Sequence, residues 1–328
     1  MSKIAVLYKS DIESIKDALN KLESFGNLVV NGLTAGELSE LENKEPALFN
    51  AVADYVNSGR WFPLAGMWFA DDNDMSALKL MRNIVYSAAF LKEKFGKDYR
   101  VFNGAKVYND EFAQVVYSSG FDAAVLDSEA DTYWLDNAAW TRTLVNSSLD
   151  KVDVNEIDGD FIGSNEFASV EDEAMSAYQR ELDLKSVRQP VYECNATCVE
   201  KLLEKAERFA TQQGKKVNED IKSAWVSLFK GDEESAKSVA EKIIADCEFD
   251  ADFIKINKED VEILTVKYAE GSDSDVVIRL KETAGKEKSL CIMCDALDAG
   301  FRCEILPYEL QTFRVIKDGF VEETPITE

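Results

Sequence analysis

Residues 59–96 place an apolar run, a cluster of acids and a long amphipathic segment one directly after another. The apolar run contains two tryptophans and has the length of a buried strand. It leads into four acid or amide residues: Asp71, Asp72, Asn73 and Asp74. The next segment repeats apolar residues at three- and four-residue intervals until Gly96, which is typical of a helix with a glycine at its end. A strand, a polar turn and a helix in this order predict a unit of an α/β protein, in which ligands bind beyond the carboxyl ends of the strands.

The same alternation of strand and helix patterns covers the first 126 residues. Short apolar runs predict strands at 3–8, 28–30, 62–69, 99–102 and 122–126. Amphipathic segments predict helices at 11–22, 46–57, 75–96 and 110–118. This order favours a parallel sheet covered by helices, that is, a parallel (β/α) barrel-like N-terminal domain at 1–190. Residues 127–165 lose the periodicity and are expected to form irregular, functional loops, followed by a helix at 170–184.

The pattern changes twice after residue 190. Three helical segments with short connections, at 197–213, 218–229 and 233–247, predict a three-helix bundle domain at 191–249. From residue 250 onward the apolar residues alternate with period two, and strands are expected at 261–268, 275–280, 289–293, 301–306 and 312–316. Such strands with short turns predict a small C-terminal antiparallel β domain at 250–328.

The charge of the chain excludes several classes of partner. The sequence has 62 acidic and 37 basic residues and a net charge of −25. This surface repels phosphate backbones and anionic lipids, so we expect no nucleic acid and no membrane among the partners. The apolar runs are too short to span a bilayer, and residues 1–8 lack the apolar core of a signal peptide. These features predict a cytoplasmic protein.

Six cysteines are too few for a disulfide framework in a chain of 328 residues. Cys291 and Cys294 have the spacing of a zinc pair, but no second pair follows and the chain contains no histidine. In the strand expected there, residues three apart point to opposite faces. Core thiols are therefore the favoured interpretation, and no metal or cofactor is expected.

Several blocks resemble the class II α-mannosidases, glycoside hydrolase family 38. Gly59-Arg60, Ala65-Gly66-Met67-Trp68, Asp72 and 91–96 (Leu-Lys-Glu-Lys-Phe-Gly) are similar in order and spacing to a strand end and helix of that family. One departure is Ala70, which stands where the family has a glutamate. Ala224-Trp225 resembles its helical bundle, and Pro307–Arg314 resembles a block of its terminal β region. The family's proteins are longer, so the resemblance implies a compact member.

The resemblance also implies a site that this chain does not complete. The family holds zinc with two histidines and two aspartates, one of which is the nucleophile. Here Lys9 replaces the first histidine, Asp11 stands at the nearby aspartate and Asp232 stands where the last zinc motif ends without its histidine. Placing Gln114 on a family glutamine aligns Tyr108 with a family tyrosine and puts Gly104 at the nucleophile. The resemblance therefore implies a degenerate member without zinc-dependent activity.

The remaining site candidates are carboxylates and aromatic rings. Asp72, Asp158 and Asp110 are the catalytic candidates, and Trp68, Asp72, Tyr108 and Asp158 are the candidates for substrate binding. Asp158 lies in a Glu-Ile-Asp-Gly block similar to a family loop near the sugar. Each also has a simpler interpretation: helix caps for Asp72, Asp110 and Asp11, a turn for Asp158, and a core position for Trp68.

Three functions remain open at this point. The favoured one is a folded but catalytically degenerate α-mannosidase-like protein whose remaining role is to bind a carbohydrate or another protein. The second is an active, metal-independent glycosidase whose relocated carboxylates lie about 5–5.5 Å apart, as a retaining pair requires. Asp71, Asp127, Glu129 and Asp131 are further acids available for it, and Trp134, Trp140 and Arg142 are other candidate contacts. The third is a structural or protein-interaction module. We expect Lys9, Asp11 and Gly104 to share one edge of the sheet with Asp72 and Asp158.

Overall fold

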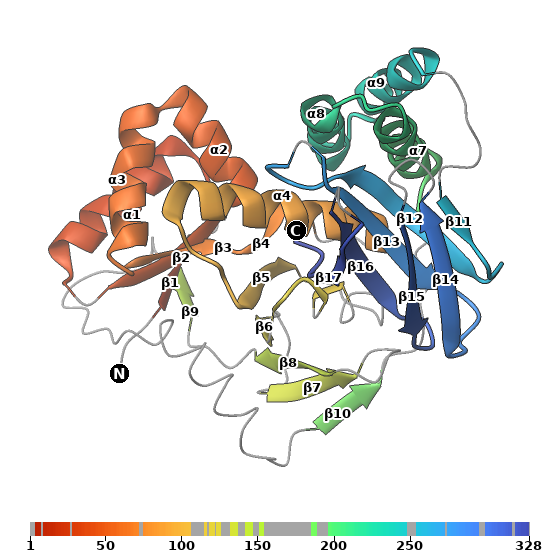
Figure 1. The fold of residues 1–328 in the computed structure, drawn as a ribbon. Helices are drawn as coiled ribbons and strands as arrows, with labels where there is room; N and C mark the ends of the chain where they lie inside the picture. Colours follow the sequence, from red (N-terminus) through yellow and green to blue (C-terminus); the bar gives the residue numbers. More distant parts are fainter. Residues whose placement is uncertain are drawn as a thin grey trace.

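A computed structural model describes most of the chain (Figure 1). The described residues are 4–7, 9–26, 28–71, 75–105, 115–116, 118–121, 123–125, 132–136, 142–146, 151–153, 185–188, 196–247, 254–272, 274–294, 299–316 and 319–327. Mixed α/β structure fills the amino-terminal part, three helices follow, and antiparallel sheets form the carboxyl-terminal part. This order agrees with the changes of periodicity along the sequence.

Parallel strands form the centre of the amino-terminal part. One sheet has the order β3-β2-β1-β9, with every neighbouring pair parallel. Its strands are β1 (Ile4–Val6), β2 (Val29–Thr34), β3 (Trp61–Leu64) and β9 (Lys151–Asp153). The second sheet has the order β10-β7-β8-β6-β5-β4. Its strands are β4 (Gly66–Asp71), β5 (Val101–Ala105), β6 (Ala123–Val125), β7 (Thr132–Asp136), β8 (Arg142–Asn146) and β10 (Lys185–Arg188).

A bend at Ala65 and Gly66 links the two sheets. β3 pairs with β2, and β4, which starts one residue later, pairs with β5. The single strand expected at 62–69 is therefore two strands in two sheets. Gly66 has a φ of 121°, and a Cβ added there would lie 2.3 Å from the ring of Phe102. Only glycine permits this backbone and this close approach.

Within the described residues of this part, four helices lie beside the strands. They are α1 (Ile12–Ser24), α2 (Ala35–Lys44), α3 (Pro46–Asn57) and α4 (Ala77–Phe95). Pro46 begins α3 and Gly96 ends α4 in the left-handed conformation, as expected from the sequence. The proposed cap of the long helix was wrong, because Ser76 and not one of the preceding acids caps α4 by accepting from the backbone N–H of Lys79.

The region expected to be irregular contains strands. β7 and β8 pair antiparallel, whereas β9 adds to the edge of β1, so the prediction of loops over 127–165 was wrong at these positions. β9 and β7 also have partners far away in sequence, β1 and β10, and pairing rather than periodicity defines these strands. The helix expected at 170–184 lies outside the described residues.

The carboxyl-terminal half joins helices to a sandwich of two sheets. The helices α7 (Cys198–Gln212), α8 (Asn218–Phe229) and α9 (Glu233–Ala245) pack on one another. One sheet is β11-β14-β15 and the other is β12-β13-β16-β17. The strands are β11 (Ile254–Ile256), β12 (Val261–Tyr268), β13 (Val276–Glu282), β14 (Lys288–Cys294), β15 (Ala299–Ile305), β16 (Leu310–Val315) and β17 (Val321–Glu323). Both sheets bury side chains in one shared core.

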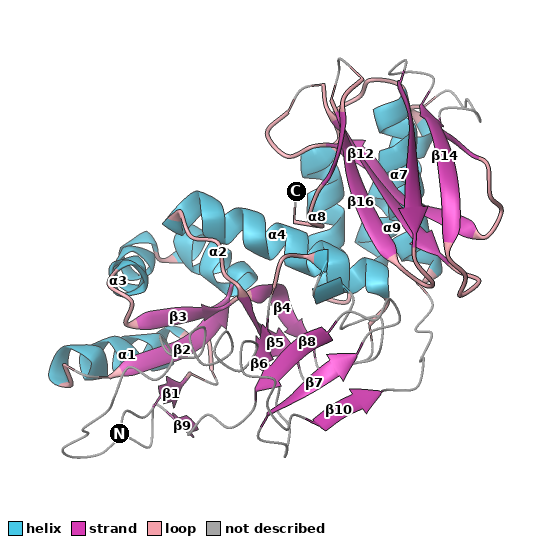
Figure 2. Cartoon of the chain, turned by 60° about the horizontal axis from the view of Figure 1, so that its bottom comes forward, coloured by secondary structure: helices cyan, strands magenta, loops and turns pink. Residues whose placement is uncertain are grey.

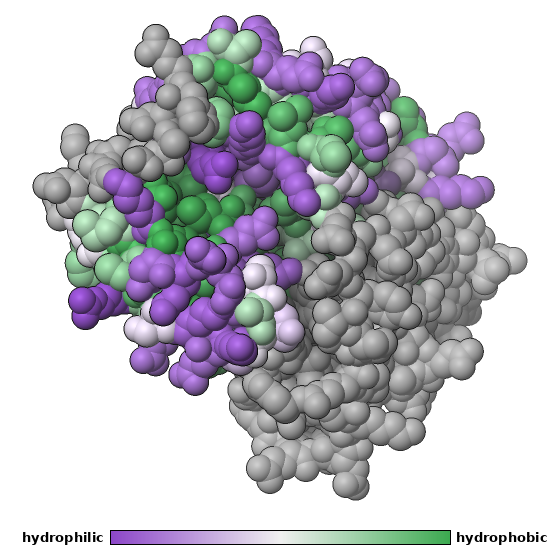
Figure 3. All heavy atoms as spheres, turned by 90° about the vertical axis from the view of Figure 1, so that its right-hand side faces the viewer, coloured by the Kyte–Doolittle hydropathy of each residue, from purple (hydrophilic) through white to green (hydrophobic). Residues whose placement is uncertain are grey.

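The outer face of the sandwich keeps some apolar surface. Figure 3 shows hydrophobic residues gathered near the middle of this side, with hydrophilic residues around them. Met293 on β14 has 45% of its surface exposed, whereas Cys294 is buried in the shared core and Cys291 is half-buried. The two cysteines thus lie in different surroundings, as the alternation of a strand requires.

Helix α4 connects the two halves through buried charges. It runs from the side of α2 and α3 to α8 (Figures 1 and 2). Arg82 on α4 is 1% exposed and binds Glu204 and Glu207 of α7, with 2.7 Å between Arg82 Nε and Glu204 Oε1. Thr265 of β12 donates to the other oxygen of Glu204 at 2.8 Å. Helix α4, helix α7 and strand β12 therefore share one buried network of ion pairs and hydrogen bonds.

Candidate functional site

The carboxyl ends of the parallel strands meet at one edge. β1 is parallel to β2, β2 to β3, and β4 to β5, while β3 leads directly into β4. Lys9 and Asp11 follow the end of β1, and Gly104 lies at the end of β5. Each of these residues thus lies at the carboxyl end of its own parallel strand, where ligands bind in proteins of this architecture, and their approach to one another stays a prediction.

Asp11 is the cap of α1. Its carboxylate accepts from the backbone N–H of Ser14 at 2.9 Å and from the Ser14 hydroxyl at 3.1 Å. The hydrogen bond from the Ser14 backbone holds the pKa of Asp11 below its ordinary value. Asp11 is exposed and ionised at neutral pH, but both of its oxygens already have donors. The simpler interpretation of Asp11 as a helix cap is confirmed.

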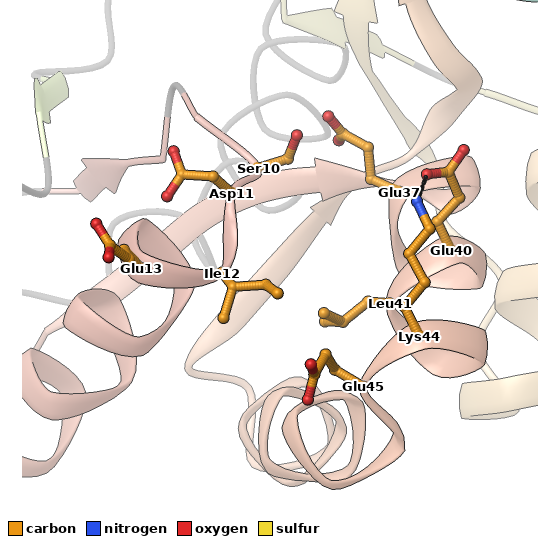
Figure 4. Close-up of a pocket in the computed structure, with 9 residues that line it drawn as sticks. All are labelled: Ser10, Asp11, Ile12, Glu13, Glu37, Glu40, Leu41, Lys44 and Glu45. Carbon is orange, nitrogen blue, oxygen red and sulfur yellow. Dashed lines mark hydrogen bonds and ion pairs between the residues drawn. The ribbon is translucent and has the colours of Figure 1, made fainter.

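An open groove lies beside Asp11, between the start of α1 and helix α2 (Figure 4). Its volume is about 490 Å³. Ser10, Asp11, Ile12 and Glu13 line one side, and Glu37, Glu40, Leu41, Lys44 and Glu45 line the other. Five of these side chains are acidic and one is basic, so the groove has a negative potential that favours cations and hydroxyl donors.

Helix α2 orders the acids on its side of the groove. Thr34 and Glu37 form a capping box, in which Glu37 accepts from the Thr34 backbone N–H at 2.7 Å. Gly36 lets α2 lie directly on β4, because a Cβ at this position would be 2.5 Å from the carbonyl oxygen of Trp68. The close packing of α2 on β4 thereby fixes the position of the α2 acids relative to this strand, which ends at Asp71.

Glu40 connects the groove to the helical region. Its carboxylate binds Lys230 at 2.5 Å and Lys44 at 2.7 Å. The hydrogen bond from Lys230 and then that from Lys44 lower the pKa of Glu40. Lys230 follows α8 and also lies 5.2 Å from the ring centroid of Phe69 on β4. A pair 190 residues apart has no signal in a single sequence, and sequence reasoning missed it.

Trp68 lies in the core next to this edge. It is 5% exposed and meets the ring of Phe90 edge-on, with 5.7 Å between the centroids. Lys222 of α8 lies 5.3 Å from its ring centroid, and Asn83 of α4 accepts from its backbone N–H at 3.2 Å. In this conformation the ring packs against protein, and its assignment as a sugar contact stays a prediction.

Most of the other candidates lie outside the described residues. These are Asp72, Tyr108, Asp110, Gln114, Asp127, Glu129, Asp131, Trp140 and Asp158. Trp134 lies in β7 and Arg142 in β8. The proposed approach of Asp72 to Asp158 therefore stays a prediction.

The donors at this edge do not fit the zinc set of family 38. Lys9 and Lys230 carry ammonium groups, which are not metal ligands at neutral pH, and Gly104 has no side chain. Asp232 caps α9 and accepts from the Ser235 backbone N–H at 3.1 Å. Among the residues that the structure describes, no group of three or more acids or cysteines could hold a metal ion.

Helix α2 was not predicted, although the sequence carries a signal for it. Thr34-Ala-Gly-Glu37 has the spacing of a capping box, which marks the start of a helix. The weak apolar pattern of 35–44 hid the helix from a reading based on periodicity.

Comparison with known proteins agrees with the resemblance seen in the sequence. Residues 36–129 match the family "Glycosyl hydrolases family 38 N-terminal domain". A crystal structure of a protein in glycosyl hydrolase family 38 from Enterococcus faecalis has a TM-score of 0.50 and 14% identity, covering 96% of this chain and 54% of that one. An alpha-mannosidase from Enterococcus faecalis V583 has a TM-score of 0.52 and 12% identity, with 96% and 55% covered.

The chain thus spans about half the length of the solved structures that it matches. No curated protein matches its sequence. Within the described part of the chain, no helix is long and apolar enough to cross a membrane.

Proposed function

We propose that this protein, a glycosyl hydrolase family 38 relative that carries the family's N-terminal domain, is α-mannosidase-like in fold but has no zinc-dependent glycosidase activity. We further propose that it binds a carbohydrate at the carboxyl edge of its parallel strands, near Asp72 and Asp158. The proposed division into a (β/α) barrel-like domain at 1–190, a helical bundle at 191–249 and a β domain at 250–328 belongs to the same hypothesis.

One observation carries the proposal: 328 residues contain no histidine, and lysine stands at the first zinc position. A zinc-dependent glycosidase needs neutral nitrogen or anionic oxygen ligands at that edge. Lys9 instead brings a positive charge to the place of the lost cation, beside the ionised Asp11. A sugar has hydroxyl donors that suit carboxylate acceptors, and the acids of the neighbouring groove supply these.

Turnover of an aryl α-mannoside tests the loss of catalysis. We expect a rate at least about a thousandfold below that of a typical enzyme, which corresponds to about 4 kcal/mol of lost transition-state stabilisation. Turnover near roughly 1 per second, abolished by Asp72→Asn, would refute this and support the alternative of a metal-independent glycosidase with relocated carboxylates.

Calorimetric titration with an α-linked mannobiose tests the carbohydrate site. We expect saturable binding that Asp72→Asn or Asp158→Asn weakens about tenfold, the effect of one lost charge-assisted hydrogen bond. Asp17→Asn is the matched control, because Asp17 is a partly exposed acid on α1 that pairs with Lys21. Absence of binding to mannobiose and to other α- and β-linked disaccharides would leave a structural or protein-interaction module as the remaining function.

A further inference from the structure

A second cavity lies at the opposite edge of the parallel strands. Its volume is about 310 Å³. Gly66 begins β4, Arg100 directly precedes β5 and Phe121 comes shortly before β6, and all three line this cavity. Because β4, β5 and β6 are parallel, the cavity faces their amino ends. It is therefore separate from the groove beside Asp11.

The charge of this cavity is opposite to that of the molecule. Three bases, Lys92, Lys97 and Arg100, line it together with one acid, Asp98. The whole chain has a net charge of −25. On such an acidic protein, the repulsion among three bases lowers the stability of the fold little. Their charges create a local positive potential, and a cavity concentrates this potential more than a flat surface does, so it attracts anions more strongly.

Two of these bases, Lys92 and Lys97, keep hydrogen-bond donors for a ligand. Lys92 pairs with Asp98 at 3.2 Å, but the two side chains are 67% and 77% exposed, so the pair is weak and an anion can compete with it. Lys97 donates one N–H to the carbonyl oxygen of Val56 at 2.7 Å. An ammonium group has three donors, so two remain on Lys97.

The other wall of the cavity is a segment from the carboxyl-terminal part, 324–327, here called the strap. Thr324, Pro325 and Thr327 of the strap line the cavity. In Figures 1 and 2 this end of the chain lies beside α4. The backbone N–H of Ile326 donates to the carbonyl oxygen of Ser118 at 2.9 Å, and Arg279 of β13 donates to that of Ile326 at 2.6 Å.

We propose that this cavity binds a phosphate group, free or carried on a monosaccharide, between the bases around 92–100 and Thr324 of the strap. Lysine and arginine are the usual ligands of phosphate. The Thr324 hydroxyl supplies a further donor, whereas that of Thr327 donates to the carbonyl oxygen of Ser119 at 3.4 Å. The volume is at the lower end of that of small-molecule sites, which suits a ligand no larger than a sugar phosphate. A bound anion would join the strap, and with it the sandwich, to the amino-terminal part.

Calorimetric titration of the full chain with inorganic phosphate, glucose 6-phosphate and glucose tests the site. We expect saturable binding of both phosphates and none of glucose. Lys92→Glu and Arg100→Glu should each weaken binding about tenfold, because reversing a charge a few Å from the anion turns attraction into repulsion. Lys16→Glu is the matched control, since Lys16 is an exposed lysine on α1, and it should change affinity less than about twofold.

Hydrogen exchange supplies the second measurement. Phosphate should slow exchange of the Ile326 amide while leaving amides within α9 unchanged. Tighter binding of glucose 6-phosphate than of phosphate assigns the site to sugar phosphates, and equal binding assigns it to phosphate alone. The proposal fails if phosphate does not saturate by about 20 mM, a weak affinity even for a small ligand. It also fails if Lys16→Glu weakens binding as much as Lys92→Glu does, or if glucose binds as well as its phosphate.

Discussion

Arg82→Met should destabilise the protein more than the loss of any exposed ion pair. Arg82 is 1% exposed, and the side chains of Glu204 and Glu207 are 7% and 4% exposed. Methionine fills a similar volume but leaves two buried carboxyl groups without their cation. Breaking a buried pair in this way costs about 3–5 kcal/mol. We expect this decrease in the free energy of unfolding at pH 8, measured by urea denaturation.

A variant on the same helix provides the control. Lys94 pairs with Glu42 at 2.8 Å, with side chains 26% and 33% exposed. Lys94→Met should therefore cost no more than about 1 kcal/mol. Tryptophan fluorescence is a suitable probe, because Trp225 lies 5.7 Å from the Arg82 guanidinium, and circular dichroism should give the same midpoint if unfolding is two-state.

The pH dependence separates charge from packing. Burial raises the pKa of Glu207 despite the opposing effect of Arg82. An acid whose pKa is higher in the folded state binds protons more readily there, so its burial costs stability as pH rises and costs less as pH falls. Without Arg82 this effect grows, and the cost of Arg82→Met should shrink between pH 8 and pH 5. A cost below about 1 kcal/mol, or one that is constant with pH, would refute the reasoning.

Three further results are expected. Glu282→Gln should make the free energy of unfolding fall less steeply in acid. Burial opposes ionisation of Glu282, but hydrogen bonds led by the backbone N–H of Tyr308 hold its pKa at about 2. The stabilisation by its carboxylate is therefore present above the ordinary glutamate pKa and disappears as pH falls toward about 2. Acid titrations of the wild type and the variant, followed by circular dichroism, would check this. Gly66→Ala should lower the free energy of unfolding by about 2–4 kcal/mol, because the added Cβ would clash with Phe102. Gly96→Ala, with open space around it, should lower it by only about 1 kcal/mol. Elemental analysis of untagged, dialysed protein should find zinc below stoichiometric amounts, and one retained zinc per chain would contradict the donor argument.

Local signals in the sequence were enough to predict many elements. Asp11, Pro46 and Gly96 mark helix ends because capping and ring closure depend on residues within one turn. The period-two pattern after residue 250 predicted the five strands β12 to β16 of the sandwich to within two residues at their ends, but not the short edge strands β11 and β17. The resemblance to family 38 also came from local blocks, whose order and spacing are readable without a structure.

Other features were decided only by tertiary structure. Strand β9 exists through its pairing with the distant β1, β7 pairs with the distant β10, and the bend at Gly66 divides one apolar run between two sheets. Glu40 meets Lys230, and Arg82 meets Glu204, across 190 and 122 positions. The sequence by itself determined several helix ends, the periodicities and the absence of histidine, because these depend on residue type and short spacing. Which charges are buried together, and which cavity the strap closes, depends on how distant segments pack, and a single sequence carries no signal for that.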